Sequence, residues 1–159
     1  MTPPEVISGI AAALQQSALG EAARASGWLY PLANMAHVLG AALLVGSVVT
    51  FDLQVLRRAS SAYAVYGTAI SVAVTGFVLQ IISGIVLLSA DAAAVVRNPA
   101  FLFKMAMLLV GLANVAVFHW QFGRATKAGV VFLGARILAA VSLVSWALVL
   151  LAGRAIAYI

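Results

Sequence analysis

The residues from Pro31 to Phe51 form an uncharged run about as long as an α-helix needs to be to cross a bilayer. This run nevertheless contains Asn34 and His37, and Asp52 follows it directly. Lipid cannot hydrate an imidazole or a carboxamide, so polar side chains within a span must face protein, water or a ligand. The run therefore predicts a membrane-spanning helix with one side that faces something other than lipid.

The whole chain has the composition of an integral membrane protein in contact with a lipid bilayer. Of its 159 residues, 65% are hydrophobic and 8% are charged, whereas about a quarter of the residues of a soluble domain are charged. The nine lysines and arginines stand singly or in pairs between apolar runs, as loop charges do in membrane proteins. The net charge of +5 is therefore no sign of nucleic-acid binding, and the absence of cysteine excludes disulfides and thiolate chemistry.

Apolar runs of this length occur four times, which predicts an all-α integral membrane four-helix bundle, with residues 1–159 as a single membrane domain. The expected transmembrane helices cover residues 28–51, 66–90, 99–120 and 130–152. Residues 2–26 are expected to form an amphipathic helix on the membrane interface or against the bundle. Thr2 is placed as its N-cap, Pro3 as its first residue and Glu5 as the partner in a capping box.

Four spans place both termini on the same side of the membrane. The side away from the termini carries five basic residues, and the side of the termini carries four. These residues are Arg57, Arg58, Arg124, Lys127 and Arg136 on the first side, and Arg24, Arg97, Lys104 and Arg154 on the second. Because cytoplasmic loops are enriched in basic residues, the termini are predicted to be periplasmic and the bundle to lie in a bacterial inner membrane.

Polar and sulfur-containing residues of the four expected helices fall at a similar depth. His37 lies about 10–14 Å below the outer boundary at 1.5 Å per residue, and Gln80, Met107 and Ser145 count to the same level. The sequence therefore predicts a cofactor-binding pocket in the outer half of the membrane, lined by His37, Asn34, Gln80, Lys104, Met107, Asn114 and Ser145. The alternative is structural, because small and polar residues also join membrane helices by close packing and hydrogen bonds.

A second polar cluster is expected at the cytoplasmic ends of the first and third spans. These two helices run parallel, so Asp52 can approach His119 or Arg124. One interpretation is an interfacial ion pair that fixes the helix ends. The other is a point at which protons enter or leave the bundle.

The spacing of the two histidines limits the cofactors that one subunit can bind. His37 and His119 differ in depth by about 15 Å at 1.5 Å per residue, too far to ligate one haem iron. A His37–Met107 pair matches in depth and is a known axial ligand set, which makes these two the candidate metal ligands. Two histidines without cysteine make a zinc site poor, and no catalytic triad order or phosphate-binding loop supports a hydrolase or kinase.

The leading functional hypothesis is a redox-type membrane subunit that binds haem b or a quinone in the outer-half pocket. A first alternative is a non-catalytic scaffold or accessory subunit whose small-residue faces bind partner membrane subunits or a second copy of the chain. A second alternative is a small transporter or metal permease. Four helices per subunit make a homo-oligomer almost necessary for transport.

The first span and the segments after it carry an ordered set of residues. They are Ser26-Gly27-Trp28-Leu29-Tyr30-Pro31, His37, Gly40, Leu43-Leu44-Val45-Gly46 and Asp52-Leu53, followed by Gly76-Phe77, Ser83-Gly84, Asn98-Pro99 and Phe103-Lys104. The pattern resembles a family of small four-helix bacterial inner-membrane proteins whose domain has no known function. The resemblance extends from Ser26 to about Trp120 and implies the same fold. Gln54 departs from the arginine expected at that position, which removes a cytoplasmic charge there.

Overall fold

A computed structural model describes residues 2–57, 61–127 and 130–158. Over these ranges the regular secondary structure is entirely helical. The helices are α1 (Pro3–Gln15), α2 (Ala18–Ala25), α3 (Leu29–Leu56), α4 (Ser61–Ala90), α5 (Ala92–Val95), α6 (Pro99–Lys127) and α7 (Leu133–Ala155). The long helices α3, α4, α6 and α7 are each long and apolar enough to cross a membrane. The predicted all-α fold is confirmed, and the chain is a multi-pass membrane protein with four spans.

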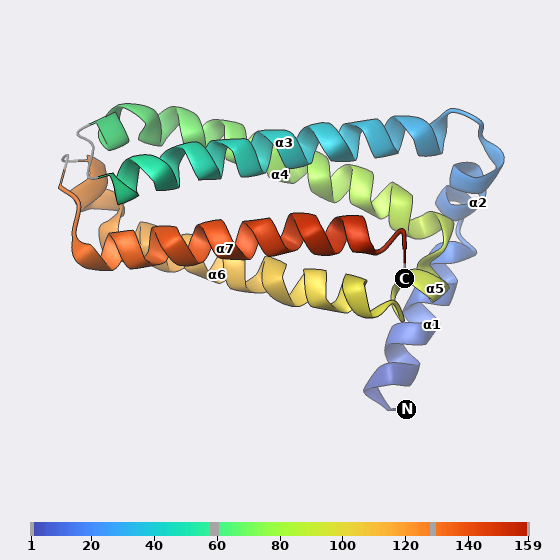
Figure 1. Ribbon diagram of the computed structural model, residues 1–159. Coiled ribbons are helices and arrows are strands. Elements are labelled where there is room, and N and C mark those ends of the chain that lie inside the picture. Colours follow the sequence, from blue (N-terminus) through green and yellow to red (C-terminus); the bar gives the residue numbers. More distant parts are fainter. Residues whose placement is uncertain (1, 58–60, 128–129, 159) are drawn as a thin grey trace.

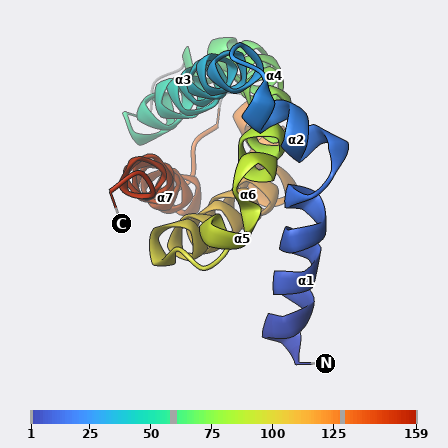
Figure 2. The same cartoon turned by 90° about the vertical axis from the view of Figure 1, so that its right-hand side faces the viewer.

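The long helices form two antiparallel hairpins (Figure 1). α3 packs along α4, α6 packs along α7, and contacts between α3 and α7 join the hairpins, whereas α4 and α6 contact each other much less. Both termini lie at one end of the bundle, which we call the terminal end. The other end, where α3 ends and α7 begins, is the opposite end. α1, α2 and α5 lie across the terminal end (Figure 2).

Three of the long helices extend further at the opposite end than the hydropathy of the sequence predicts. α3 ends at Leu56, α4 begins at Ser61 and α6 continues to Lys127. Hydropathy marks the part of a helix that matches the hydrocarbon core, whereas backbone hydrogen bonds continue the helix into the headgroup region. α6 begins where predicted, because Asn98 Oδ1 caps its first turn and accepts a hydrogen bond from the Ala100 N–H at 2.9 Å.

The N-terminal segment forms two helices instead of the single helix expected over residues 2–26. Ser17 begins the second helix, because its Oγ accepts a hydrogen bond from the Gly20 N–H at 3.3 Å. Arg24 fixes the turn to the bundle: its Nη1 donates to the carbonyl oxygens of Gln15 at 2.8 Å and Ala90 at 3.2 Å. The break between α1 and α2 thus follows from a capping serine within an otherwise helical pattern.

α1 lies across the bundle axis (Figures 1 and 2). It begins as predicted, with the Thr2 N–H donating to Glu5 Oε2 at 2.6 Å. Ala11 is buried, whereas Ile7 and Ile10 are 55% and 65% exposed. A helix with this orientation and an exposed apolar face is suited to lie in the membrane interface.

Two groups of buried apolar side chains hold the long helices together. The group near the opposite end consists of Val55, Tyr66, Phe118, Ala135 and Ala139. The group in the middle of the bundle consists of Leu44, Val45, Trp146 and Val149. Large apolar side chains on the outer faces of all four long helices are exposed, among them Met35, Ile82, Leu109 and Leu151. A bilayer covers such a surface, which has no polar shell of its own.

Candidate functional site

α3 and α4 cross closely enough for their backbones to touch. A Cβ atom on Gly40 would lie 2.9 Å from the Gly76 carbonyl oxygen, and one on Gly76 would lie 2.5 Å from the Leu44 backbone nitrogen. Both positions therefore require glycine, as in other close contacts between membrane helices. The crossing brings His37, one turn before Gly40, against α4, and Gln80, one turn after Gly76, against α3.

His37 is fixed at this crossing through its backbone and through its ring. Gln80 Nε2 donates to the His37 carbonyl oxygen at 2.6 Å. His37 Nδ1 lies 3.0 Å from Ser83 Oγ. Gly84 leaves room for the ring, since a Cβ atom there would lie 3.3 Å from His37 Cε1. The structure thus brings together His37 and Gln80, which the depth count placed at one level.

The Ser83 hydroxyl determines which ring nitrogen of His37 carries the proton. Ser83 is 3% exposed, and its Oγ donates to the Leu79 carbonyl oxygen at 2.5 Å. A hydroxyl has one proton to donate, so towards His37 the oxygen is an acceptor and Nδ1 carries the hydrogen. In the neutral ring, Nε2 then presents a lone pair, with which histidine binds a metal or accepts a hydrogen bond.

Lys104 brings a positive charge to this region from the other hairpin. Its side chain runs beside α7, where a Cβ atom on Gly153 would lie 3.5 Å from Lys104 Nζ. The side chain is partly buried, and the ammonium is close enough to His37 to interact with it electrostatically. It forms no hydrogen bond or ion pair with the described residues. We call His37, Gln80, Ser83 and Lys104 the His37 site.

Three further residues of the predicted pocket make no described contact with the His37 ring. Asn34 is exposed one turn before His37 on α3. Met107 packs with the apolar group around Trp146, and Ser145 is buried on α7. Depth was the basis for grouping Met107 and Ser145 with His37, but residues at one depth can point to different sides of a helix bundle.

Asn114, another residue of the predicted pocket, lies towards the opposite end of the bundle. It is buried, and its Nδ2 donates to the Leu138 carbonyl oxygen at 3.1 Å. Leu138 is in the second turn of α7, which begins at Leu133 at the opposite end. Asn114 therefore joins α6 to α7 near the Asp52 region and does not line the outer-half pocket.

The sequence does not single out Ser83 as a site residue, although Ser83 follows Gln80 by three positions and shares its helical face. Serines in membrane helices commonly donate to a carbonyl of their own helix, as Ser47 and Ser71 do here. Ser83 makes the same bond and also receives the His37 ring. Only the packing of α3 on α4 reveals that second contact.

The polar residues expected to cluster at the opposite end are separated. Asp52 is 4% exposed, and its Oδ2 has no hydrogen-bond partner among the described residues. A polar neighbour of the carboxyl group is Ser142 of α7. His119 is exposed and its Nδ1 donates to the carbonyl oxygen of its own helix at Val115, 2.9 Å away. Arg124 is exposed as well, and these residues form no ion pair with one another among the described contacts.

The rotation of α6 explains this separation. Phe118, and not His119, points towards α3, where its ring centroid lies 5.4 Å from that of Phe51. His119 is the next residue around the helix, and its ring centroid lies 5.7 Å from that of Tyr66 on α4. A count of depth cannot supply this rotation.

The donor set of the described residues does not favour a metal held by several side chains. No group of three or more His, Asp or Glu residues that could hold a metal ion occurs within the described ranges. His37 Nε2 suits one axial position of a haem iron. Met107, the predicted second ligand, packs instead with the apolar group around Trp146. The His37 site therefore offers one nitrogen ligand, with a cationic donor nearby.

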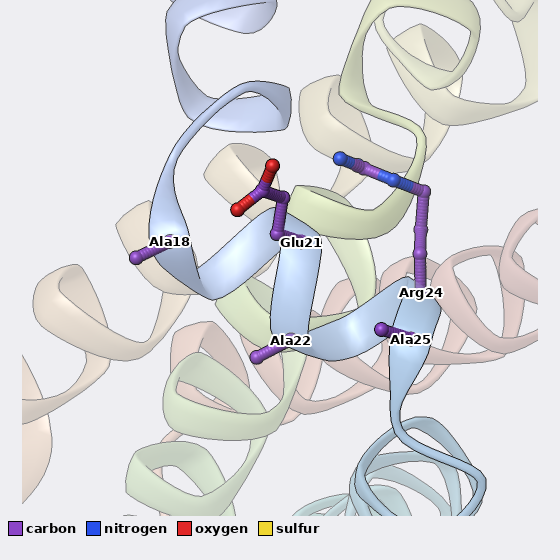
Figure 3. A pocket seen from close by; sticks show the side chains of 5 residues that line it. All are labelled: Ala18, Glu21, Ala22, Arg24 and Ala25. Atoms are coloured by element: carbon purple, nitrogen blue, oxygen red, sulfur yellow. The ribbon is translucent and has the colours of Figure 1, made fainter.

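Two surface hollows lie away from this site. One of about 690 Å³ lies beside α2, with Glu21 and Arg24 on the same side of the helix (Figure 3). Its Arg24 guanidinium already bonds to two carbonyl oxygens. The other, of about 420 Å³, lies between α3 and α4 and is lined by Ala42, Leu43, Gly46, Ser47, Thr50, Ala64, Val65, Thr68, Ala69 and Val72. Neither hollow includes His37.

No protein-family model, curated protein or solved structure matches this chain. The functional interpretation therefore depends on the chemistry of the His37 site and on the membrane-spanning fold. That fold places the His37 site within a bilayer, where a ligand is either a lipid-soluble molecule or a group bound to a partner protein.

Proposed function

We propose that this protein is a redox-type subunit of a bacterial inner membrane that binds a quinone or haem b at the His37 site, and that a quinone fits the site better. The observation that supports the proposal is the 3.0 Å contact between His37 Nδ1 and Ser83 Oγ, which leaves the Nε2 lone pair available to a ligand. In this proposal the terminal end faces the periplasm, in line with the basic residues at the opposite end.

The polar groups of the His37 site match the oxygen atoms of a quinone ring. His37 Nε2 accepts a hydrogen bond from a quinol hydroxyl, and the Lys104 ammonium donates to a carbonyl or phenolate oxygen. A partly buried ammonium without a partner is costly in a membrane interior, and an acceptor oxygen offsets part of that cost. A lipid-soluble ring enters from the bilayer between α4 and α6, the neighbouring helices with few contacts.

Haem b is the second ligand class, because imidazole oriented through Nδ1 is a common axial ligand. Lys104 would pair with a propionate, and the chain supplies Nε2 of His37 as the iron ligand. Met107, which would supply the second ligand to the iron, packs with the group around Trp146. This incomplete ligand set is why a quinone is preferred.

The test is to purify the protein in a mild detergent and measure both ligands at once. A dithionite-reduced spectrum reports haem through its Soret band, and chromatography of a solvent extract reports quinone. His37→Ala removes the site, and His119→Ala is the matched control, because His119 is the chain's other histidine and is exposed. We expect stoichiometric quinone in the wild type and in His119→Ala, and loss in His37→Ala. No haem and no quinone above the His37→Ala background would overturn the proposal.

The 420 Å³ groove between α3 and α4 favours a second candidate, a scaffold that pairs with a second copy of the chain. The hydroxyls of Ser47 and Thr50 in its wall already donate to carbonyls of α3, at 2.7 and 2.8 Å, so a helix can pack there without leaving them unsatisfied. A Cβ atom on Gly46 meets nothing within 4 Å, so Gly46→Leu fills the groove without an internal clash at Cβ. Under this candidate, native mass spectrometry shows a dimer that Gly46→Leu removes and His37→Ala preserves. A monomer in the wild type would exclude it.

A further inference from the structure

Asp52 is buried inside the bundle, although it lies only four residues before the end of α3. It is 4% exposed, and its Oδ2 has no hydrogen-bond partner among the described residues. The residues on either side along the helix face, Phe51 and Val55, pack with the apolar group of Tyr66, Phe118 and Ala139. Apolar side chains thus flank the carboxyl group, and the hydroxyl of Ser142 on α7 is a polar neighbour.

No described basic side chain compensates a negative charge at Asp52. From α7, Arg136 Nε donates to the Leu56 carbonyl oxygen at 3.2 Å. On α6, His119 and Arg124 are exposed, and on α3, Arg57 is exposed. From α4, Tyr66 packs edge-on against Phe51, with ring centroids 5.5 Å apart. An ionised carboxylate without a counter-charge is costly in such surroundings, so the neutral, protonated form is favoured.

The Ser142 hydroxyl has no described bond to a carbonyl oxygen of its own helix, in contrast to three serines of α3 and α4. Ser47, Ser71 and Ser83 each donate to the carbonyl oxygen four residues earlier. For Ser142 that acceptor would be Leu138, whose carbonyl oxygen receives the Asn114 Nδ2–H at 3.1 Å in addition to the helical backbone bond. Both lone pairs of that oxygen are therefore used, and the Ser142 hydroxyl remains available to Asp52.

We infer that Asp52 and Ser142 form a proton-exchange site, in which the carboxyl group takes up a proton from, and releases it to, water at the opposite end of the bundle. In the protonated state the Asp52 O–H donates to Ser142 Oγ. After Asp52 releases its proton, the Ser142 hydroxyl rotates and donates its own hydrogen to the Asp52 carboxylate. Asn114 is a positioning residue, because it occupies the carbonyl oxygen to which Ser142 would otherwise bond. Residues Asp52 and Ser142 are called the Asp52 site.

This inference goes beyond the proposed function and is independent of it. Asp52 follows His37 by fifteen residues on α3, which is about 22 Å along the helix. The site needs no ligand at His37, and the experiment below detects it in protein that holds neither quinone nor haem.

Infrared spectroscopy of the full chain, reconstituted in phosphatidylethanolamine–phosphatidylglycerol vesicles, tests the proton-exchange site. The chain has two aspartates, Asp52 and Asp91. Carbon-13 aspartate labelling of the Asp91→Asn protein therefore marks Asp52 alone without altering it. We expect an isotope-shifted carbonyl band of a protonated carboxylic acid, its further downshift on transfer to deuterium oxide, and its loss in favour of carboxylate bands at high pH.

Three variants assign the band. Asp52→Asn removes it, Ser142→Ala shifts it to higher frequency because the acceptor is lost, and Asn114→Ala shifts it because Ser142 can then bond to Leu138. Circular dichroism verifies that each variant is helical, and the labelled Asp91→Asn protein decides the question where Asp52→Asn does not fold. A labelled Asp52 that gives only carboxylate bands at every pH would overturn the inference. A carboxylic-acid band that neither shifts in deuterium oxide nor responds to pH would overturn the inference as well, because the Asp52 proton would then not exchange with water.

Discussion

His37 and Asp52 lie on the same helix, α3, yet their side chains differ in how fully they are hydrogen-bonded. At His37 the neighbouring helix satisfies both the backbone carbonyl and ring Nδ1, through Gln80 and Ser83. At Asp52 one carboxyl oxygen has no partner in the described structure, and the polar neighbour of the group is Ser142 of α7. The difference follows from helix spacing: glycines bring α3 within hydrogen-bonding reach of α4, whereas larger side chains lie between α3 and α7. A close backbone contact thus gives the His37 ring and carbonyl hydrogen-bond partners, whereas apolar side chains around Asp52 leave Oδ2 without one.

The largest effect is expected from separating α3 and α4. In Gly76→Leu, the Cβ atom alone would lie 2.5 Å from the Leu44 backbone nitrogen, and overpacking of this kind costs about 1–3 kcal/mol or more. We expect a lower melting temperature in detergent and loss of ligand at His37, while the Asp52 infrared band persists. Gly46→Ala is the control, since a Cβ atom there meets nothing within 4 Å. Equal melting temperatures for Gly76→Leu and the wild type would refute the close crossing.

A smaller and more selective effect is expected from Ser83→Ala, which removes the acceptor for His37 Nδ1. Loss of such an outer partner weakens a ligating histidine by about 10–100-fold, so we expect at least tenfold weaker quinone binding in a titration. Stability should change by only about 0.6 kcal/mol, the usual value for a hydrogen bond between membrane helices. Ser71→Ala is matched to it, because Ser71 lies on the same helix, is exposed and bonds to Gly67 at 3.1 Å. If both variants bind as the wild type does, Ser83 does not orient the ring.

Asn114→Ala tests whether the Asp52 site depends on a positioning residue. The variant frees a lone pair of the Leu138 carbonyl oxygen and loses one hydrogen bond, at a cost of about 1 kcal/mol. The Asp52 infrared band should shift, denaturation in detergent should show that modest loss of stability, and quinone binding at His37 should stay unchanged. Weaker binding at His37 would show that the two sites are not separate.

The smallest effect is expected from Arg136→Gln. Arg136 Nε donates to the Leu56 carbonyl oxygen at 3.2 Å, and such a cation at a helix C-terminus contributes about 0.3–1 kcal/mol. A small drop in melting temperature, compared with the exposed-residue control Arg124→Gln, is the expected outcome, with the Asp52 infrared band unchanged. If that band appears or disappears in Arg136→Gln, Arg136 is a counter-charge for Asp52, and the contrast between the two sites fails.

The sequence predicts the four spans because burial in lipid requires long apolar runs, and it predicts the start of α6 because Asn98 and Pro99 encode a cap. It does not predict the division of the N-terminal segment at Ser17 or the short helix α5, both of which depend on local hydrogen bonds at the terminal end. Composition therefore determines the membrane-embedded part of the fold better than the part at the interface.

For the candidate site, depth counting places His37 and Gln80 together, and the structure does so too, because both flank the Gly40–Gly76 contact. Asn114 was also assigned to the predicted pocket, but it bonds to α7 near the opposite end. The depth of a residue in the membrane can be counted from its residue number. The rotation of each helix about its axis and its shift along that axis are set by packing against the other helices. The same limit hid Ser83 and Ser142, whose hydroxyl directions depend on the neighbouring helix.

The measurement that tests the central claim most directly is nitrogen-15 solid-state NMR of histidine-labelled protein in bilayers. In the His119→Ala variant, His37 is the chain's remaining histidine, so its two ring nitrogens give the entire signal. We predict a neutral ring with the proton on Nδ1 and an unprotonated Nε2 whose resonance moves when a short-chain benzoquinol is added. A proton on Nε2, or an Nε2 resonance that does not respond to the quinol or to haem, would contradict the assignment of His37 as the ligand-binding group.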